Sequence, residues 1–189
     1  MRMVSALLAL GMLAVPAWAE MPAECRVAHH LVEDNLRLPA VASAIAAKHL
    51  NVLVLGAGSS VLPGPGGVNL AYPERLRLAL IETFPGVAVS LTTDITPHRS
   101  AIKMAESLVG DLGKAKPDLL VWQTGTVDAM EGTDQDLFNQ ALDKGISIAK
   151  SAGADTVLVN AQYSPRTESI IALGNYAEIM RWVAATCVM

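Results

Sequence analysis

"NVLVLGAGSSVLPGPG", residues 51–66, is the stretch that decides the fold of this chain. Its apolar run Val52–Leu55 predicts a short strand that is buried on both faces. The segment Gly56–Gly58 then allows a tight turn, and the hydroxyls of Ser59 and Ser60 follow it directly. In an open α/β sheet, ligands bind at the carboxyl ends of the strands, so we expect these hydroxyls at a binding or catalytic site.

Two nucleotide-binding motifs that also follow a first strand are excluded. A dinucleotide fingerprint, G-x-G-x-x-G, needs a third glycine where this chain has Val61, and it leads straight into a helix. Here Pro63 and Pro65 lie in a long interval before the next helix, which is predicted to begin at Tyr72-Pro73. A phosphate-binding P-loop is excluded because neither Gly-Lys-Ser nor Gly-Lys-Thr follows the turn.

Apolar runs alternate with amphipathic segments along the rest of the chain. Strands are predicted at Val52–Leu55, Val87–Leu91, Leu119–Gln123 and Thr156–Asn160. Helices are predicted at 40–48, 73–83, 97–112, 134–151 and 168–185, with Thr96 and Thr133 as the N-caps of the third and fourth. This alternation is typical of a parallel sheet with right-handed crossovers. The predicted fold is therefore a three-layer α/β/α sandwich, flavodoxin-like, with strand order 2-1-3-4.

The first 19 residues have the pattern of a secretory signal peptide. Arg2 supplies the positive charge, residues 4–15 are apolar, and Ala17-Trp18-Ala19 is a small-x-small cleavage site. We therefore predict cleavage after Ala19 and a secreted or periplasmic protein. The expected domain organisation is a signal peptide at 1–19, an N-terminal segment and helix at 20–49, and an α/β domain at 50–189.

The charge and composition of the chain argue against several classes of partner and ligand. The formal net charge is −4 and no basic stripe is visible, which argues against nucleic acid as a partner. No apolar run after the signal peptide is long enough to span a membrane. No cofactor is expected, and the two cysteines, Cys25 and Cys187, lack the histidine cluster of a zinc site. Whether these cysteines form a disulfide, and whether the chain forms oligomers, stay open at this point.

Two segments together resemble the SGNH (GDSL-like) hydrolases. Gly56-Ala57-Gly58-Ser59-Ser60 is similar to the first block of that family, in which the nucleophilic serine follows the first strand. The segment Leu119–Asp128 is similar to the third block, a strand followed by Gly-x-Asn-Asp. The resemblance spans Leu50 to Tyr163 and implies hydrolysis of an ester bond, such as an acyl group on a carbohydrate or a lipid. It also implies a fifth strand followed by Asp-x-x-His, and this chain ends at Met189 with neither. The α/β domain is therefore expected to be incomplete at its C-terminus; the alternative is a natural four-stranded variant.

The resemblance leaves two candidates for the nucleophile. Ser59 directly follows the glycine turn and is the first choice, and Ser60 is the second. Ester hydrolysis needs such a hydroxyl, a base that activates it, and donors for the developing oxyanion. Alternatively, both hydroxyls only cap the loop by bonding backbone groups, as serine often does in turns.

The other expected site residues depart from the family pattern. Asp94 stands where the family has a glycine that donates its N–H, and Val127 stands where an asparagine donates from its side chain. Gly125, Thr126 and Asp128 remain at the same strand end, and the base is unknown. His98 is expected on an exposed position at the start of a helix. We therefore expect a weak or inactive esterase; the alternative is a non-catalytic domain that binds a glycan or an acyl chain in the cell envelope.

Overall fold

The structure is a computed structural model that describes residues 37–62, 64–162 and 164–187. The described residues belong to one compact unit, residues 36–189. The predicted signal peptide and Cys25 lie outside the described residues. Within the described part of the chain, none of the helices is long and apolar enough to cross a membrane.

Helices and strands alternate as the sequence predicts, with some additional short elements. Along the chain these are α1 (Pro39–Ala46), β1 (His49–Gly56), the 3-10 turn η3 (Gly58–Ser60), α2 (Gly67–Leu70), α3 (Tyr72–Thr83), β2 (Ala88–Ile95), α4 (Ala101–Ala115), β3 (Leu119–Gln123), α5 (Thr126–Glu131), α6 (Gln135–Ser151), β4 (Asp155–Val159), α7 (Pro165–Glu168) and α8 (Leu173–Cys187).

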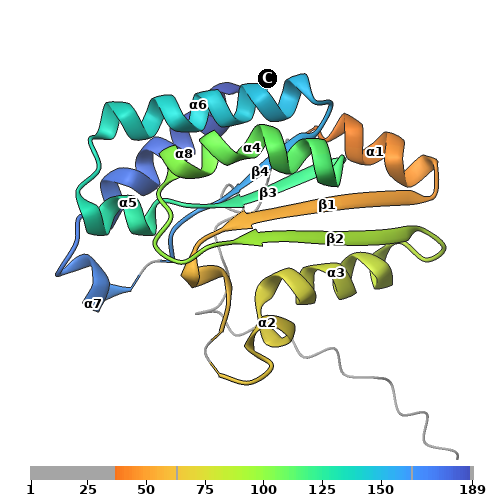
Figure 1. Ribbon diagram of the computed structural model, residues 1–189, viewed down its shortest axis with the longest axis horizontal. Helices are drawn as coiled ribbons and strands as arrows, with labels where there is room; N and C mark the ends of the chain where they lie inside the picture. Colours follow the sequence, from red (N-terminus) through yellow and green to blue (C-terminus); the bar gives the residue numbers. More distant parts are fainter. Residues whose placement is uncertain (1–36, 63, 163, 188–189) are drawn as a thin grey trace, which may run out of the picture. The chain divides into compact units, whose positions relative to one another are not determined.

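The four strands form one parallel sheet with the predicted order β2-β1-β3-β4. Strand β1 is central: Leu55 is in register with Asp94 on one side and with Trp122 on the other. Because all strands run the same way, their carboxyl ends meet at one edge of the sheet, at the left of Figure 1. The loops that follow β1, β2 and β3 therefore lie next to one another.

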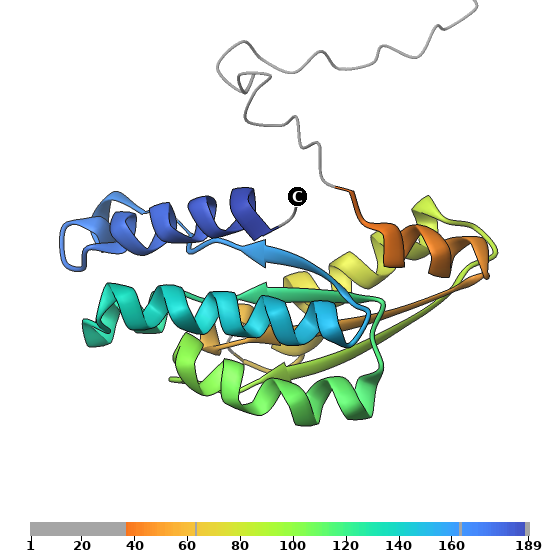
Figure 2. The same cartoon turned by 90° about the horizontal axis from the view of Figure 1, so that it is seen from above.

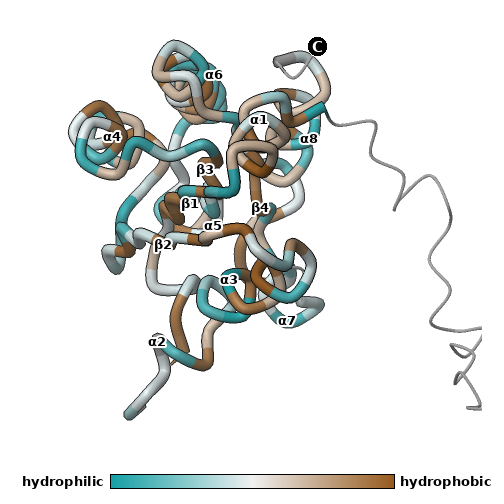
Figure 3. The backbone as a smooth tube through the Cα atoms, turned by 90° about the vertical axis from the view of Figure 1, so that its right-hand side faces the viewer, coloured by the Kyte–Doolittle hydropathy of each residue, from teal (hydrophilic) through white to brown (hydrophobic). Residues whose placement is uncertain are grey.

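Alternate residues of the strands bury their side chains in two separate cores. Helices α4, α6 and α8 lie side by side over one face of the sheet (Figures 1 and 2), whereas α3 covers the other together with α1. The larger core contains Leu53, Leu55, Leu120 and Trp122 from the sheet, and the smaller core contains Val52, Val54 and Val121. Figure 3 shows the hydrophobic strands β1 and β3 between these helical layers. The predicted three-layer α/β/α sandwich is confirmed.

Trp122 of β3 lies in the larger core, and the helix above it makes room for its ring. The indole is fully buried and donates its N–H to the sulfur of Met104, 3.1 Å away. A Cβ atom added at Gly145 of α6 would lie 2.3 Å from the ring. A side chain at position 145 would therefore overpack the core.

Three predicted helix starts are wrong. The last helix, α8, begins at Leu173 instead of residue 168, because the separate short helix α7 ends at Glu168. The other two corrections have a local cause. Helix α4 begins at Ala101 instead of Pro97, because β2 continues to Ile95 and pairs with β1 over its whole length. Helix α6 is capped by Asp134 instead of Thr133, since the Asp134 carboxylate accepts hydrogen bonds from the N–H groups of Asp136 and Leu137, the second and third residues of that helix. The short helices α5 and α7 were not predicted.

Candidate functional site

The carboxyl edge of the sheet brings together the loops that the sequence singled out. The ladder between β1 and β2 ends with Gly56 opposite Ile95, and the N–H of Thr96 still donates to the carbonyl of Gly56 at 3.2 Å. On the other side of β1, strand β3 ends at Gln123. The side chain of Gln123 then contacts the serine turn.

Ser60 is buried and holds the turn against β3. The residue is 1% exposed, and its hydroxyl donates a hydrogen bond to Oε1 of Gln123 at 2.7 Å. A Cβ atom at Gly56 would lie 2.1 Å from the Ser60 oxygen, so only glycine fits there. This hydrogen bond between neighbouring loops is a structural role that the sequence alone did not reveal.

The hydroxyl of Tyr72 lies in the same buried region as Ser60. Burial raises the pKa of Tyr72, and a contact with the Ser60 hydroxyl partly offsets the rise. Among the described residues, however, the Tyr72 oxygen has no hydrogen-bond partner of good geometry. Together with Gln123, these side chains form a small polar cluster beneath the serine turn.

Ser59 is the exposed member of the serine pair. It is the second residue of the 3-10 turn η3, whose two backbone hydrogen bonds run from Ser60 to Ala57 and from Val61 to Gly58. The N–H groups at the start of such a turn have no acceptor within it. Those of Gly58 and Ser59 have no hydrogen-bond partner among the described residues. An exposed hydroxyl thus stands beside two free backbone donors.

The segment after β3 turns into α5 and carries the second group of predicted residues. Gly125 has φ +93° and a tightly packed surrounding, with the Met180 sulfur 3.3 Å from the position of a Cβ atom. Thr126 is half-buried at the start of α5, and Val127 packs against the larger core. An apolar side chain at position 127 is thus used in packing, and it offers no donor to a ligand.

Asp128 is fully buried and serves a neighbouring helix. Both carboxylate oxygens accept a hydrogen bond from the N–H of Ala101, each at 3.1 Å, and the Thr124 hydroxyl donates to one of them. Burial raises the pKa of Asp128, and the hydrogen bonds from Ala101, from its own N–H, from Gly125 and from Thr124 oppose the rise. The carboxylate therefore caps the first turn of α4.

Asp94 lies on the face of the sheet that α4 covers. Its carboxylate accepts a hydrogen bond from Arg99 at 2.6 Å, and its backbone carbonyl accepts a second one from the same guanidinium at 2.8 Å. The Arg99 side chain is 11% exposed and also reaches the carbonyl of Gly56 at 3.4 Å. Arg99 thus neutralises the charge that the sequence placed near a developing oxyanion, and it joins the ends of β1 and β2.

Asp111 of α4 completes the group around Arg99. The Ser107 hydroxyl donates to Asp111 at 2.9 Å. Burial acts to raise the pKa of Asp94, but the hydrogen bond and charge of Arg99, with a contribution from Asp111, lower it overall. Burial and the neighbouring Asp94 carboxylate raise the pKa of Asp111. The pair therefore resembles one salt-bridged carboxylate beside one that ionises less readily.

His98 does not lie on a helix, contrary to the sequence-based expectation. It is exposed, in the turn between β2 and α4, with φ +57°. Pro97, just before it, lies against the serine turn, since a Cβ atom at Gly58 would be 3.9 Å from the Pro97 Cα. The sequence signal for Thr96-Pro97 as a helix start concealed this placement.

A cavity of 190 Å³ opens beside the serine turn, between the end of β2 and the start of α3. Its lining is apolar at Val61, Pro73, Leu91 and Ile95 and polar at Asn69, Glu74 and Thr93. Val61 directly follows Ser60 in the chain. The cavity is therefore placed to receive part of a molecule held at the serine turn.

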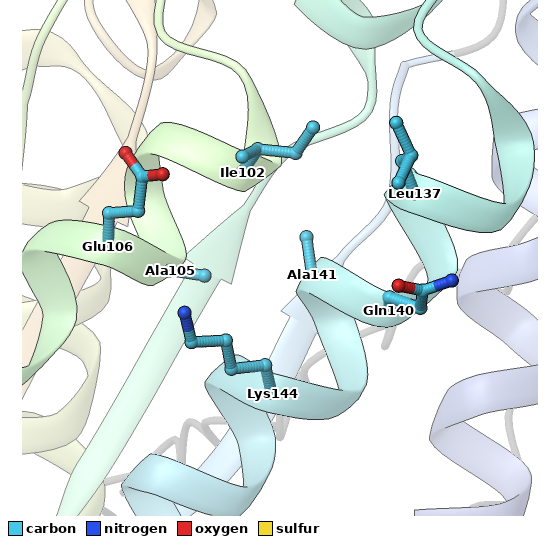
Figure 4. Close-up of a pocket in the computed structure, with 7 residues that line it drawn as sticks. All are labelled: Ile102, Ala105, Glu106, Leu137, Gln140, Ala141 and Lys144. Carbon is cyan, nitrogen blue, oxygen red and sulfur yellow. The ribbon is translucent and has the colours of Figure 1, made fainter.

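A second cavity, of 170 Å³, lies between α4 and α6. Figure 4 shows small apolar side chains, Ala105 and Ala141, at its centre, with Glu106 on one wall and Lys144 on the other. This cavity lies between helices of the layer that covers the sheet, whereas the serines lie at the carboxyl edge of the sheet. Within the described part of the chain, no group of His, Cys, Asp and Glu is arranged to hold a metal ion.

Comparisons with known proteins agree with this architecture. The chain superimposes on TesA with a TM-score of 0.61 and 21% identity, over 72% of this chain and 73% of that one. For a lipase/acylhydrolase from Enterococcus faecalis the TM-score is 0.60, with 17% identity and 73% of each chain covered. A variant of Axe2, an acetyl xylan esterase from Geobacillus stearothermophilus, gives 0.56 and 14%, over 72% of this chain and 73% of that one. These likenesses show a shared fold.

No curated protein matches the sequence significantly. The sequence does match one family over almost its whole length, from residue 24 to residue 188, which includes both serines and the segment after β3. The resemblance to SGNH and GDSL-type lipases is thereby confirmed at the level of family and fold. The chain belongs to the non-GDSL lipase-like family.

Proposed function

We propose that this protein is a weak hydrolase of ester bonds, with Ser59 as its nucleophile. The observation that carries the proposal is the contrast between the two serines at the end of β1. The Ser60 hydroxyl is buried and donates its proton to Gln123, whereas Ser59 is exposed next to the free N–H groups of Gly58 and Ser59. Backbone donors of this kind stabilise the oxyanion of an acyl-transfer intermediate.

The substrate is an ester with a small acyl or alcohol group. The 190 Å³ cavity next to the turn has apolar walls at Leu91 and Ile95 and is large enough for a short group only. An acylated carbohydrate or lipid satisfies this requirement, and the Axe2 relative in fold is an acetyl xylan esterase. Weak activity follows from Val127, because losing one oxyanion donor costs about 10²–10³ in rate.

A fluorophosphonate probe, followed by peptide mapping, tests the nucleophile. We expect the label on Ser59, loss of labelling in Ser59→Ala, and retained labelling in Ser60→Ala. Hydrolysis of p-nitrophenyl acetate is measured in the same variants. We expect turnover well below the usual enzymatic median of about 10 s⁻¹, and its loss in Ser59→Ala. Labelling on Ser60 alone would move the nucleophile to the second choice.

A non-catalytic role is the second candidate, and Val127 favours it. That side chain packs against the larger core where the family uses a donor. If neither serine is labelled and p-nitrophenyl acetate is hydrolysed at the background rate, the same cavity serves binding of a glycan or acyl ligand. Isothermal titration with acetylated xylooligosaccharides and with short-chain fatty acids would then separate these two ligands.

We also propose that the protein is exported. The support is the apolar segment 4–15 and the cleavage site Ala17-Trp18-Ala19. The mature chain would then begin at Glu20, followed by the N-terminal segment to residue 49 and the α/β domain. Intact-mass measurement of protein from a secreting host tests this, and retention of Met1 would contradict it.

A further inference from the structure

We propose that His98 is the general base that activates Ser59. The proposal deepens the function proposed above and rests on it. It starts from the register of the two strands that lead to these residues. Strands β1 and β2 pair up to Gly56 opposite Ile95. Position 59 and position 98 lie the same number of residues beyond that pair.

The two chains stay together after the ladder ends. The N–H of Thr96 donates to the carbonyl of Gly56 at 3.2 Å. Two positions further along β1, a Cβ atom at Gly58 would be 3.9 Å from both the Cα and the Cβ of Pro97. The serine turn and the turn after β2 are therefore in contact at Gly58 and Pro97. Ser59 and His98 are the residues that directly follow these two contacting positions.

The backbone of His98 is in a conformation that is costly for its side chain. Its φ of +57° lies in the left-handed region, where a residue with a Cβ costs about 1–2 kcal/mol relative to the right-handed one. A glycine or asparagine would make this turn at lower cost. The imidazole is exposed and forms no hydrogen bond with any described residue. Asparagine, aspartate and histidine are the residues that, apart from glycine, most often adopt a positive φ, so this turn accommodates a histidine whose imidazole remains available for chemistry.

Other titratable groups at this edge of the sheet are already engaged. The Asp94 carboxylate accepts the hydrogen bond of Arg99. The Asp128 carboxylate is fully buried and accepts the N–H of Ala101. His49, the other histidine in the described part of the chain, lies at the opposite end of β1, 3.9 Å from Asp118. His98, which follows Pro97 in the turn that contacts Gly58, is thus the titratable side chain near Ser59 that no described residue engages.

The reaction has two half-reactions, formation and hydrolysis of an acyl-serine, and in each one His98 takes up one proton and returns one. The neutral imidazole of His98 takes the proton of Ser59 as Oγ attacks the ester carbonyl carbon and forms a C–O bond. The tetrahedral intermediate then breaks its bond to the alcohol oxygen, which leaves with the proton from the imidazolium. Water, giving a proton to the same imidazole, attacks the acyl-serine. Collapse releases the carboxylic acid, and Oγ recovers its proton.

Ser59 and His98 are expected to hydrolyse the ester slowly. In a Ser-His-Asp triad the carboxylate fixes the tautomer of the histidine, and its loss costs about 10⁴ in rate. Here the nearest carboxylate in sequence, Asp94, is held by Arg99. A two-membered site without an orienting carboxylate agrees with the weak activity proposed above.

The test compares His98→Asn, His98→Gly and the matched control His49→Asn. Asparagine and glycine both tolerate a positive φ, so these variants should fold, which urea unfolding would verify. We expect p-nitrophenyl acetate hydrolysis to fall by about 10²–10⁴ in both His98 variants, the usual effect of removing a general base. His49→Asn should stay within about twofold of the wild type, since position 49 is remote from the site. Added imidazole should restore activity to His98→Gly, and it should not do so in Ser59→Ala.

Failure of the inference and failure of the proposed function give different results. If the wild type is labelled at Ser59 and turns over, but His98→Asn retains its rate, the inference is overturned and the hydrolase function stands. If imidazole fails to rescue a slow His98→Gly variant, His98 acts through structure and the inference is also overturned. If the wild type is neither labelled nor active, both proposals fall together.

Discussion

Two aspartates at the carboxyl edge of the sheet are held in opposite ways. Asp94 ends β2 and pairs with the guanidinium of Arg99, which lowers its pKa despite partial burial. Asp128, after β3, is fully buried and held by the N–H of Ala101, by other backbone donors and by Thr124, and burial raises its pKa. The first carboxylate is neutralised by a charge and the second by dipoles. Neither carboxylate is free to serve the serine turn.

The largest effect is expected from removing the carboxylate of Asp128, which is held by N–H and hydroxyl donors and not by a charged group. Asp128→Ala leaves the N–H of Ala101 buried without an acceptor and removes the cap of α4. We expect a loss of about 2–4 kcal/mol in the free energy of unfolding, from an unsatisfied donor and a lost cap together. Urea denaturation measures it, with Asp136→Ala, an exposed first-turn aspartate of α6, as a control that should change stability by less than about 0.5 kcal/mol. Equal effects in the two variants would refute the capping role.

The second largest effect is expected from removing the guanidinium of Arg99, which holds the carboxylate of Asp94. Arg99→Gln leaves the carboxylates of Asp94 and Asp111 facing each other without a cation bonded to them, and the carbonyl of Gly56 loses a contact. We expect a loss of about 1–3 kcal/mol, as for a charged hydrogen bond in a partly buried site. The matched control is Arg181→Gln, whose ion pair with Glu178 is exposed and should be worth less than about 1 kcal/mol. A loss at Arg99 no larger than the control would show that its bonds are dispensable.

The comparison also shows where sequence reasoning succeeds. The bounds of β3 and the position of the serines after β1 follow from local patterns of apolar residues and glycine, and the strand order follows from the flavodoxin-like fold that the alternation of elements predicts. The roles of the two aspartates do not. Asp128 acts on a helix that begins 27 residues earlier in the chain, and no periodicity within one segment encodes such a contact.

Local signals even misplaced one residue of the proposed site. Thr96-Pro97 has the chemistry of a helix start, and the sequence therefore put His98 on α4. Pairing of β2 with β1 up to Ile95 delays the helix to Ala101. Tertiary pairing outweighed the capping preference there, as it often outweighs local propensity. For the same reason, the hydrogen bond that distinguishes Ser60 from Ser59 was visible only once β1 and β3 were neighbours.

A third prediction uses pH to separate the two aspartates. The raised pKa of Asp128 means that its contribution favours folding below the pKa of the unfolded chain and is lost as pH rises through the folded value. The lowered pKa of Asp94 has the opposite consequence, because its contribution is present at neutral pH and is lost as pH falls through the folded value. Stability relative to Asp128→Asn should therefore increase on acidification, and stability relative to Asp94→Asn should decrease. Urea unfolding of the three proteins from neutral to acidic pH measures both slopes, and slopes of equal sign would contradict the assignment.

The smallest effect is expected at Asp111, the second carboxylate near Arg99. The neighbouring Asp94 charge and burial already raise the pKa of Asp111, so a neutral amide there removes repulsion. Asn in its place can still accept the hydrogen bond of Ser107 through its Oδ1 atom. We therefore expect Asp111→Asn to change the free energy of unfolding by less than about 1 kcal/mol, towards greater stability. In the Arg99→Gln background only the charge of Lys114 still acts on Asp94, so the same substitution should stabilise more than it does in the wild type. A double-mutant cycle measures this difference, and high salt should reduce it, since screening weakens repulsion between partly exposed charges. An identical effect in both backgrounds would mean that Arg99 does not mediate between Asp94 and Asp111.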